Sequence, residues 1–464
     1  MDRSIIQGGM GVYISTPFLA NVCSRAGALG TVSCVGAERL LARILQSGDR
    51  GGHYRRALAH FPFPGIAERI VRKYFVEGGI PASQEFKVVP AFSMQPRSDL
   101  IALTVAASFA FVWLAKEGHE GPVSVNYLEK IQIPHIYHIT GAMLASVDFV
   151  TMGAGITLQI PGVLDAIAAG GVPSYRVSVE GSRDGTATIG FDPSAFFKAE
   201  IPELKRPAFL PIVSTDVLAS LMTKRLPAGS IQGFVVELPT AGGHNAPPRE
   251  KGAVDESGQS VYGPKDEVAF GKLRDLGIPF WIGGSFASPE GRAKAQALGA
   301  VGIQAGSIFA LSEDSGMDPS FRARIRRLGY RGELVVRTDP NASPTGFPFK
   351  VVQLPGTQSD PTVYAERTRI CDLSILTVPY RREDGKFGFR CRSEPVDTYL
   401  RKGGKREDAM GVRCLCNGLF SAAGLGNPHE PPIFTSGDDV SFLRRLMRDE
   451  NDSYRAADAV AYLS

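Results

Sequence analysis

The stretch GFVVELPTAGGHN, residues 233–245, joins a short apolar run to a glycine-rich loop that carries a histidine. The run from Gly233 to Glu237 has the length and composition of a buried strand. The loop from Ala241 to His244 then follows the carboxyl end of that strand. The stretch therefore predicts one strand of a parallel sheet, with His244 at the edge where barrels of such strands place their active sites.

The same unit recurs along the chain. Short β-branched runs alternate with helical stretches, which is the pattern of βα units around a parallel sheet. We expect strands at residues 4–7, 29–33, 122–126, 147–152, 209–213, 233–237, 279–282 and 299–304. Eight strands in this order predict an α/β fold, a (β/α)₈ TIM barrel with a helical insertion and a C-terminal extension.

We assign residues 1–36 and 122–315 to the barrel, residues 37–121 to a helix-rich insertion between strands two and three, and residues 316–464 to an extension that wraps the barrel. An extended piece is expected at 86–92. A hairpin is expected at 177–191, around the turn from Ser182 to Gly185. The last segments, 441–449 and 453–464, are predicted to form solvated helices.

Composition excludes several function classes. The chain has 464 residues, 44% of them hydrophobic, and a net charge of +4 from 51 basic and 47 acidic residues. This balance indicates neither a nucleic-acid nor a membrane partner. The apolar stretch 101–115 would form a helix of roughly 22 Å, shorter than the ~30 Å of a bilayer core. We expect no secretory leader, and the six cysteines do not make a disulfide scaffold, so a cytoplasmic enzyme is predicted.

A phosphate site is predicted after strands seven and eight. Gly283 and Gly284 follow the first of these strands, and Ala305, Gly306 and Ser307 follow the second. Loops at these two positions commonly bind phosphate in barrels, and glycine lets main-chain N–H groups approach the anion. Ser288 and the Pro289 after it predict a helix start, and a second helix start near Ser307 would add its dipole. The alternative is that these glycines only form tight turns.

Histidine is suited to moving a proton near neutral pH, which makes His244 the candidate catalytic residue. Its alternative role is structural. Glycines after the first strand would let a flat ring lie against the main chain, Met10 could pack on that ring, and Asn126 could offer an amide at the end of strand three. The candidate ligand-binding residues of this group are Gly8, Gly9, Met10, Gly11 and Asn126.

The roles of the other cysteines and histidines stay open at this stage. Four cysteines crowd into the C-terminal part, where a Cys-Leu-Cys fragment allows either a metal site or buried free thiols. His135 and His138 are three residues apart in what we expect to be a proline-rich loop region without nearby acids, which does not favour a metal site there. The four cysteines are Cys371, Cys391, Cys414 and Cys416.

Taken together, the motifs resemble the nitronate monooxygenase family (2-nitropropane dioxygenases) and its relatives among the FMN-dependent enoyl reductases. The resemblance covers roughly residues 4–315, in family order. It is carried by residues 5–11, 26–31, 152–155, 241–244, 282–284 and 302–307. The chain departs from the usual pattern at Leu238, Thr240, Ser285 and Phe286, which affects substrate identity more than cofactor identity.

The resemblance implies FMN in the barrel and no metal at the reaction centre, with flavin contacts from residues 8–11, Asn126 and Glu237. It implies that the phosphate lies near Gly284, Gly306 and Ser307, and that His244 is the catalytic residue. The small-molecule substrate would be an alkyl nitronate or nitroalkane oxidised with O₂. In that reaction a nitronate reduces FMN, and His244 removes the α-proton of a neutral nitroalkane.

Three alternatives remain open. The first is an enoyl-thioester reductase that uses NAD(P)H, with His244 helping to protonate the α-carbon. The second is a non-catalytic role with a vestigial flavin, and the third is a phosphate-binding barrel without flavin. The sequence also leaves a homodimer open.

Overall fold

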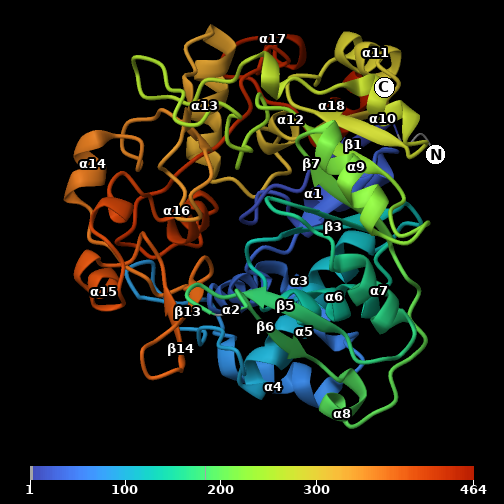
Figure 1. Cartoon of the computed structure of the whole chain (residues 1–464), viewed down its shortest axis with the longest axis vertical. Coiled ribbons are helices and arrows are strands. Elements are labelled where there is room, and N and C mark those ends of the chain that lie inside the picture. Colours follow the sequence, from blue (N-terminus) through green and yellow to red (C-terminus); the bar gives the residue numbers. More distant parts are fainter. Residues whose placement is uncertain (1–3, 183) are drawn as a thin grey trace.

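Eight parallel strands form one sheet in the computed structural model, which describes residues 4–182 and 184–464. The sheet order is β1-β10-β9-β8-β7-β4-β3-β2. Ile6 forms a parallel bridge with Leu29, just before β2, which closes the sheet into a barrel. The predicted (β/α)₈ barrel is therefore confirmed (Figure 1). Its strands are β1 (Ile5–Gln7), β2 (Gly30–Ser33), β3 (Val123–Leu128), β4 (Phe149–Gly153), β7 (Ala208–Val213), β8 (Phe234–Glu237), β9 (Phe280–Gly283) and β10 (Gly302–Ala305).

Helices follow the strands around the outside of the barrel. Several begin at a capping side chain: Thr16, Thr215 and Ser288 each accept a hydrogen bond from the first turn of the helix they precede. The helices between the strands are α1 (Pro17–Arg25), α5 (Ser98–Lys116), α6 (His135–Leu144), α7 (Ile160–Ala168), α9 (Asp216–Arg225), α10 (Phe270–Asp275), α11 (Pro289–Ala297) and α12 (Ser307–Ala310), with the 3₁₀ turn η2 (Pro264–Asp266) before α10.

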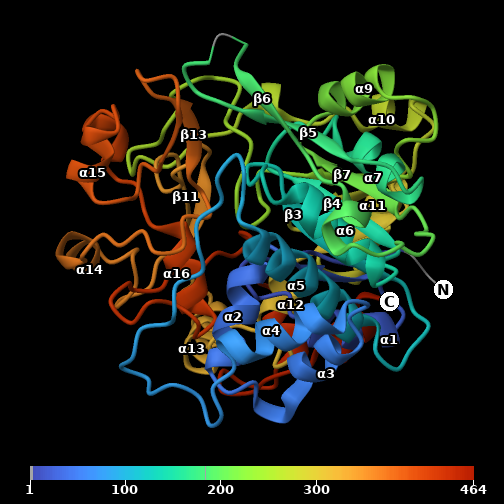
Figure 2. The same ribbon diagram turned by 90° about the horizontal axis from the view of Figure 1, so that it is seen from below.

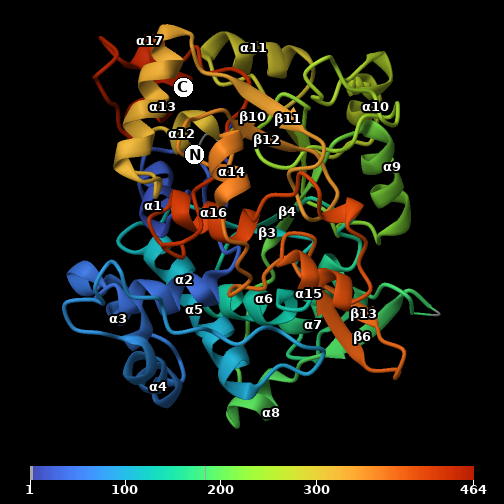
Figure 3. The ribbon, with the colours of Figure 1, turned by 90° about the vertical axis from the view of Figure 1, so that its left-hand side faces the viewer.

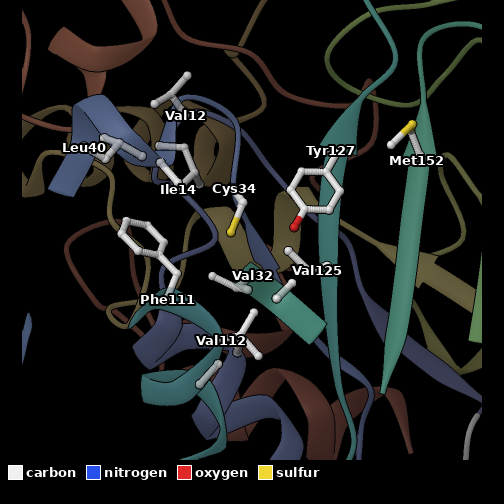
Figure 4. Close-up of a cluster of buried hydrophobic side chains, with 14 of the residues drawn as sticks. Val12, Ile14, Val32, Cys34, Leu40, Phe111, Val112, Val125, Tyr127 and Met152 are labelled. Carbon is white, nitrogen blue, oxygen red and sulfur yellow. The ribbon is translucent and has the colours of Figure 1, made fainter. Parts of the chain in front are cut away.

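Two apolar layers hold the barrel together, because successive side chains of a strand point to opposite faces. One small cluster, which fills the barrel interior, consists of Ile6, Leu29, Leu210, Val235 and Trp281. The larger layer lies between the strands and the helices. Figure 4 shows part of it, where Val32 and Val125 of neighbouring strands gather with Phe111 and Val112 of α5.

The segment between β2 and β3 is helical, as expected, and the piece at 86–92 forms neither helix nor strand. Helix α5 is longer than the predicted stretch 101–115 and packs against α1, α2 and α6. Among the described residues it is the one helix long and apolar enough to cross a membrane, yet 72% of its apolar window is buried inside the molecule. The other elements of this segment are α2 (Ala37–Gln46), η1 (Arg50–Gly52), α3 (His53–Ala59) and α4 (Pro64–Tyr74).

The expected hairpin is present as an antiparallel pair, β5 (Ser174–Ser178) and β6 (Thr186–Gly190), followed by α8 (Pro193–Phe197). Arg183 in its turn, like residues 1–3 before the first strand, lies outside the described residues. Between β5 and that turn, Glu180 forms a bridge with Tyr380, so the hairpin reaches the C-terminal extension.

The C-terminal extension lies along one side of the barrel, in orange and red in Figures 2 and 3. The last helix was predicted to be solvated, but it packs on α1 through its buried residues Ala456, Ala459 and Leu463. The domain boundaries given above stay a prediction. The elements of the extension are α13 (Pro319–Arg331), β11 (Val336–Asp339), β12 (Phe349–Val352), α14 (Pro361–Glu366), β13 (Val378–Arg381), β14 (Phe387–Arg390), α15 (Val396–Arg401), η3 (Glu407–Ala409), α16 (Leu415–Ala422), α17 (Leu443–Leu446) and α18 (Ala456–Leu463).

The close pairing of β10 with β1 predicts that replacing Gly302 destabilises the barrel. A Cβ added at Gly302 would lie 1.8 Å from the carbonyl oxygen of Ser4, so Gly302→Ala must push β10 away from β1. We expect a loss of at least about 2 kcal/mol in the free energy of unfolding, measured by urea denaturation. Gly162→Ala is the matched control, since a Cβ there meets nothing within 4 Å. Equal stability of the two variants would contradict this packing.

Candidate active site

The carboxyl ends of the barrel strands surround a cavity of about 250 Å³. All twelve residues predicted for the site line this cavity, so the structure brings together loops from five different strands. Their roles toward a cofactor or substrate remain predictions. The residues are Gly8, Gly9, Met10, Gly11, Asn126, Glu237, His244, Gly283, Gly284, Ala305, Gly306 and Ser307.

The loop after β1 lies flat against its neighbours. The N–H of Gly8 donates to the carbonyl of Ala305 over 2.8 Å, and the N–H of Met10 donates to Ser15 Oγ over 2.9 Å. A Cβ at Gly9 would lie 2.2 Å from the Cβ of Asn126. Glycine is therefore required there by close approach, and it brings the amide of Asn126 to the cavity wall.

The loop that carries His244 is held by the C-terminal extension. The N–H of Asn245 donates to the carbonyl of Pro348, and the N–H of Lys350 donates to the carbonyl of Gly243, each over 2.9 Å. These two bonds form an antiparallel bridge between His244 and Phe349. A third bond, of 2.7 Å, runs from the N–H of Gly243 to Thr435 Oγ1. The extension thus fixes the main chain on both sides of the histidine.

The imidazole of His244 is oriented from the same side. Its Nε2 lies 2.8 Å from Ser343 Oγ, which in turn lies 2.8 Å from Thr345 Oγ1. Burial lowers the pKa of His244 from 6.5 to about 4, and the positive charge of Lys130 lowers it further. The ring is therefore neutral at pH 7, with one nitrogen able to accept a proton.

Two polar groups of β8 and its loop also face the cavity. Burial raises the pKa of Glu237 to about 8, so its carboxyl group is largely protonated at pH 7 and can donate a hydrogen bond. The hydroxyl oxygen of Thr240 is buried and makes no hydrogen bond to any residue that the structure describes. A buried hydroxyl without a partner is costly, which indicates that a bound group or water satisfies it.

The part of the cavity wall next to Thr240 is rich in small residues. Gly284 has φ +106° and is followed by Ser285 at φ 58°, so the loop after β9 turns through the left-handed region. Ser307 Oγ accepts a 2.8 Å hydrogen bond from the N–H of Gly437. Helix α11 begins at Ser288 as expected, but α12 has only four residues, so its dipole contributes little.

Within the described part of the chain, no lysine or arginine lines this cavity. An anion beside this part of the wall would therefore be held by main-chain N–H groups and by hydroxyls rather than by a cation. Such an arrangement matches the glycine and serine composition of both loops.

Sequence reasoning missed the contribution of the extension. Ser343 orients His244, Thr435 holds its loop, and Ser436 and Gly437 meet Ser307 across the cavity. No strand or helix pattern of the sequence links residues 343 and 435–437 to a loop some hundred to two hundred positions earlier. The run Thr435-Ser436-Gly437 has the composition of a turn and nothing more specific.

The histidine pair at 135 and 138 has structural partners. Both residues lie on α6 rather than in a loop, and His138 Nε2 lies 3.1 Å from a carboxyl oxygen of Glu38. The expectation that no acid stands near the pair was wrong, because α2 brings Glu38 from another segment. His135 Nε2 lies 3.2 Å from the carbonyl oxygen of Glu129, and burial lowers its pKa to about 3. Both histidines are buried and outside the cavity.

The low pKa of His244 can be measured directly. We expect an NMR titration to leave the ring neutral down to about pH 5, because burial disfavours the charged form. Lys130→Met should raise this pKa but keep it below 6.5, since burial is the larger of the two causes. The His244→Gln spectrum assigns the signal. A ring in the native protein that titrates near 6.5 would contradict the description of the site.

Solved structures provide a comparison, whereas no protein-family model and no curated protein matches the sequence. FabK from Thermotoga maritima matches with a TM-score of 0.45 and 15% identity over 100% of this chain and 92% of that chain. Nitroalkane oxidase from Streptomyces ansochromogenes matches with a TM-score of 0.44 and 14% identity over 99% and 94%. The enoyl reductase domain of MlnA from Bacillus amyloliquefaciens matches with a TM-score of 0.37 and 12% identity over 76% and 64%.

These names agree with the group of proteins that the sequence motifs resemble. Because the TM-scores lie below 0.5 and the identities are low, the likenesses carry no argument about what this chain does. The residues of the cavity have to carry that argument.

Proposed function

We propose that this protein is an FMN-dependent oxidoreductase that oxidises nitroalkanes or alkyl nitronates with O₂. The observation that carries the proposal is the pairing of a neutral imidazole with a cavity at the carboxyl ends of the strands. His244 is neutral at pH 7 and lines the same cavity as the glycine loops. A neutral imidazole accepts a proton, as removal of the α-proton from a nitroalkane requires.

The cavity residues fit a flavin phosphate. Gly284 leaves room that a side chain would fill, since a Cβ there would lie 2.8 Å from the unsatisfied Thr240 Oγ1. FMN supplies the transfer of electrons between substrate and acceptor when it is bound. We assign the phosphate to the loops at Gly284 and Ser307, and the ring to the loop at residues 8–11.

The polar groups on β3 and β8 suit the ring. Asn126 offers an amide from β3, and protonated Glu237 offers an O–H from β8. Both can hydrogen-bond the carbonyl and nitrogen edge of a flat heterocycle. A neutral carboxyl group is useful here because an ionised one would face the ring without a counter-charge, at a large desolvation cost.

Ser343 orients the imidazole of His244. If Nε2 donates to Ser343 Oγ, Nδ1 is left with its lone pair, and Nδ1 makes no hydrogen bond to any described residue. We assign the base to this nitrogen, with Ser343 as the positioning residue. In that arrangement the Ser343 hydroxyl is free to donate to Thr345 Oγ1, 2.8 Å away, and stays oriented toward the ring.

An enoyl-thioester reductase is the second candidate, and one observation favours it. A second cavity, of about 560 Å³, shares Ile131, Ile375 and Leu376 with the first. A small nitroalkane has no use for that volume, whereas a long acyl chain does. Against this candidate, a histidine whose pKa is about 4 is a poor proton donor at pH 7.

Removal of the histidine should separate proton removal from the rest of the reaction. We expect His244→Ala to retain FMN but to lose about 10²–10⁴-fold in kcat/KM for a neutral nitroalkane. A preformed nitronate has already lost its α-proton, so its oxidation should fall far less. Steady-state oxygen consumption measures both. Equal losses on the two substrates, or no loss on the nitroalkane, would refute the role of His244.

The pH dependence of kcat/KM also tests the assignment of His244 as the base. Because the neutral ring is the active form and its pKa is about 4, kcat/KM for the nitroalkane should stay constant from about pH 7, where Glu237 is still largely protonated, down to about pH 5 and fall below that. Anaerobic titrations then separate the two candidate functions. Bleaching of the flavin by a nitronate alone supports the oxygenase, and bleaching by NADPH alone supports the reductase.

A further inference from the structure

Four cysteines from three separate segments meet at one small cavity in the extension. Its walls also include Ser374, Ser393 and Asn417. These four are all the cysteines of the extension, and they are unpaired thiols. The cysteines are Cys371 after α14, Cys391 after β14, Cys414 at the start of α16 and Cys416 within α16.

Burial alone does not distinguish these thiols, because Cys414 and Cys416 belong to the same apolar core as Cys23 and Cys34. The four cysteines of the extension differ in lining one common cavity. Its wall also contains Leu373 and Leu376, the hydroxyls of Ser374, Thr377 and Ser393, and the amide of Asn417.

The thiols share a wall, and main-chain N–H groups donate to two of the sulfurs. The N–H of Asn417 donates to Cys414, and that of Leu376 donates to Cys416. Hydrogen bonds to sulfur of this kind stabilise thiolates that bind metals.

We propose that Cys371, Cys391, Cys414 and Cys416 form a four-thiolate site for a thiophilic metal centre, a Zn²⁺ ion or an iron–sulfur cluster. Four thiolates are the usual ligand set of both. Binding converts each thiol to a thiolate and releases its proton to solvent, so the metal replaces the protons in the cavity. The site goes beyond the proposed oxidation and does not depend on it.

The cysteine side chains have to rotate before they can bind a metal together. Among residues 4–182 and 184–464, no three His, Cys, Asp or Glu side chains already stand in an arrangement that could hold an ion. The thiols are directed at oxygens instead: Cys391 Sγ lies 3.2 Å from Ser393 Oγ, and Cys371 Sγ lies 3.8 Å from Ser374 Oγ. A cysteine moves between staggered rotamers at small cost, and the cavity of about 10 Å³ has room for a single ion once the thiols face it, whereas a cluster would also need the thiols to draw apart.

The site would lie against the wall of the main cavity, because Cys416 and Leu376 line both. A metal there would tie together α16 and the segments at 371 and 391, and α16 itself contributes Leu415 and Leu419 to the main cavity. The structural consequence is a fixed wall beside the proposed flavin.

Metal analysis of the full-length protein, purified without oxygen, tests the proposal. We expect one centre per chain, either zinc by elemental analysis or iron with acid-labile sulfide. Cys391→Ser and Cys414→Ser should each lower the metal content at least about tenfold. Cys23→Ala is the control: it removes a buried thiol of α1, away from the cavity, and should keep the metal.

A second measurement avoids dependence on the folding of the variants. Native protein stripped with a chelator is titrated with Co²⁺, and a four-thiolate site gives intense sulfur-to-cobalt charge-transfer absorption together with proton release. The proposal is overturned if the native protein takes up neither Zn²⁺, Co²⁺ nor iron with sulfide. It is also overturned if both serine variants bind as much metal as the native chain. FMN content, measured in parallel, reports on the proposed function separately.

Discussion

The site depends on a short antiparallel bridge between the loop of His244 and the strand that begins at Phe349. Its two main-chain hydrogen bonds, from Asn245 to Pro348 and from Lys350 to Gly243, join the barrel to its C-terminal extension. A glycine-rich loop is conformationally free on its own, and fixing it costs entropy at every residue. The bridge supplies that order and brings Ser343 within 2.8 Å of the imidazole. The extension is thus part of the site rather than a wrapping around it.

The barrel and the C-terminal extension contribute different parts of the site. The barrel places glycines, Asn126 and Glu237 at the strand ends, where parallel strands bring their loops to one edge. The extension then adds apolar residues such as Phe434 and Leu419 to the wall of the cavity. The low pKa of His244 follows mainly from burial, to which the contacts with the extension contribute. The extension therefore favours the neutral form of the imidazole as well as orienting it.

The sequence predicted the barrel well because each strand is a short apolar run with a loop of distinctive composition at its end. The observed strands differ from the predicted ranges by a few residues at most, as at β10, which starts at Gly302 rather than near 299. The residues of the barrel loops all reach one cavity for the same reason. Contacts between residues that are distant in the sequence could not be predicted, because no local pattern records them. Examples are the contact of Glu38 with His138, the contact of Ser343 with His244, and the cavity shared by four cysteines from separate segments.

The central claim is that the cavity beside His244 holds FMN by its phosphate. Titration of FMN into flavin-free protein, followed by the quenching of flavin fluorescence, tests this claim most directly. The account predicts saturation at one FMN per chain, and much weaker binding when Gly284 is replaced by valine, whose side chain would occupy the space beside Thr240. A native protein that leaves the fluorescence unchanged, or a valine variant that binds FMN as tightly as the native chain, would contradict it.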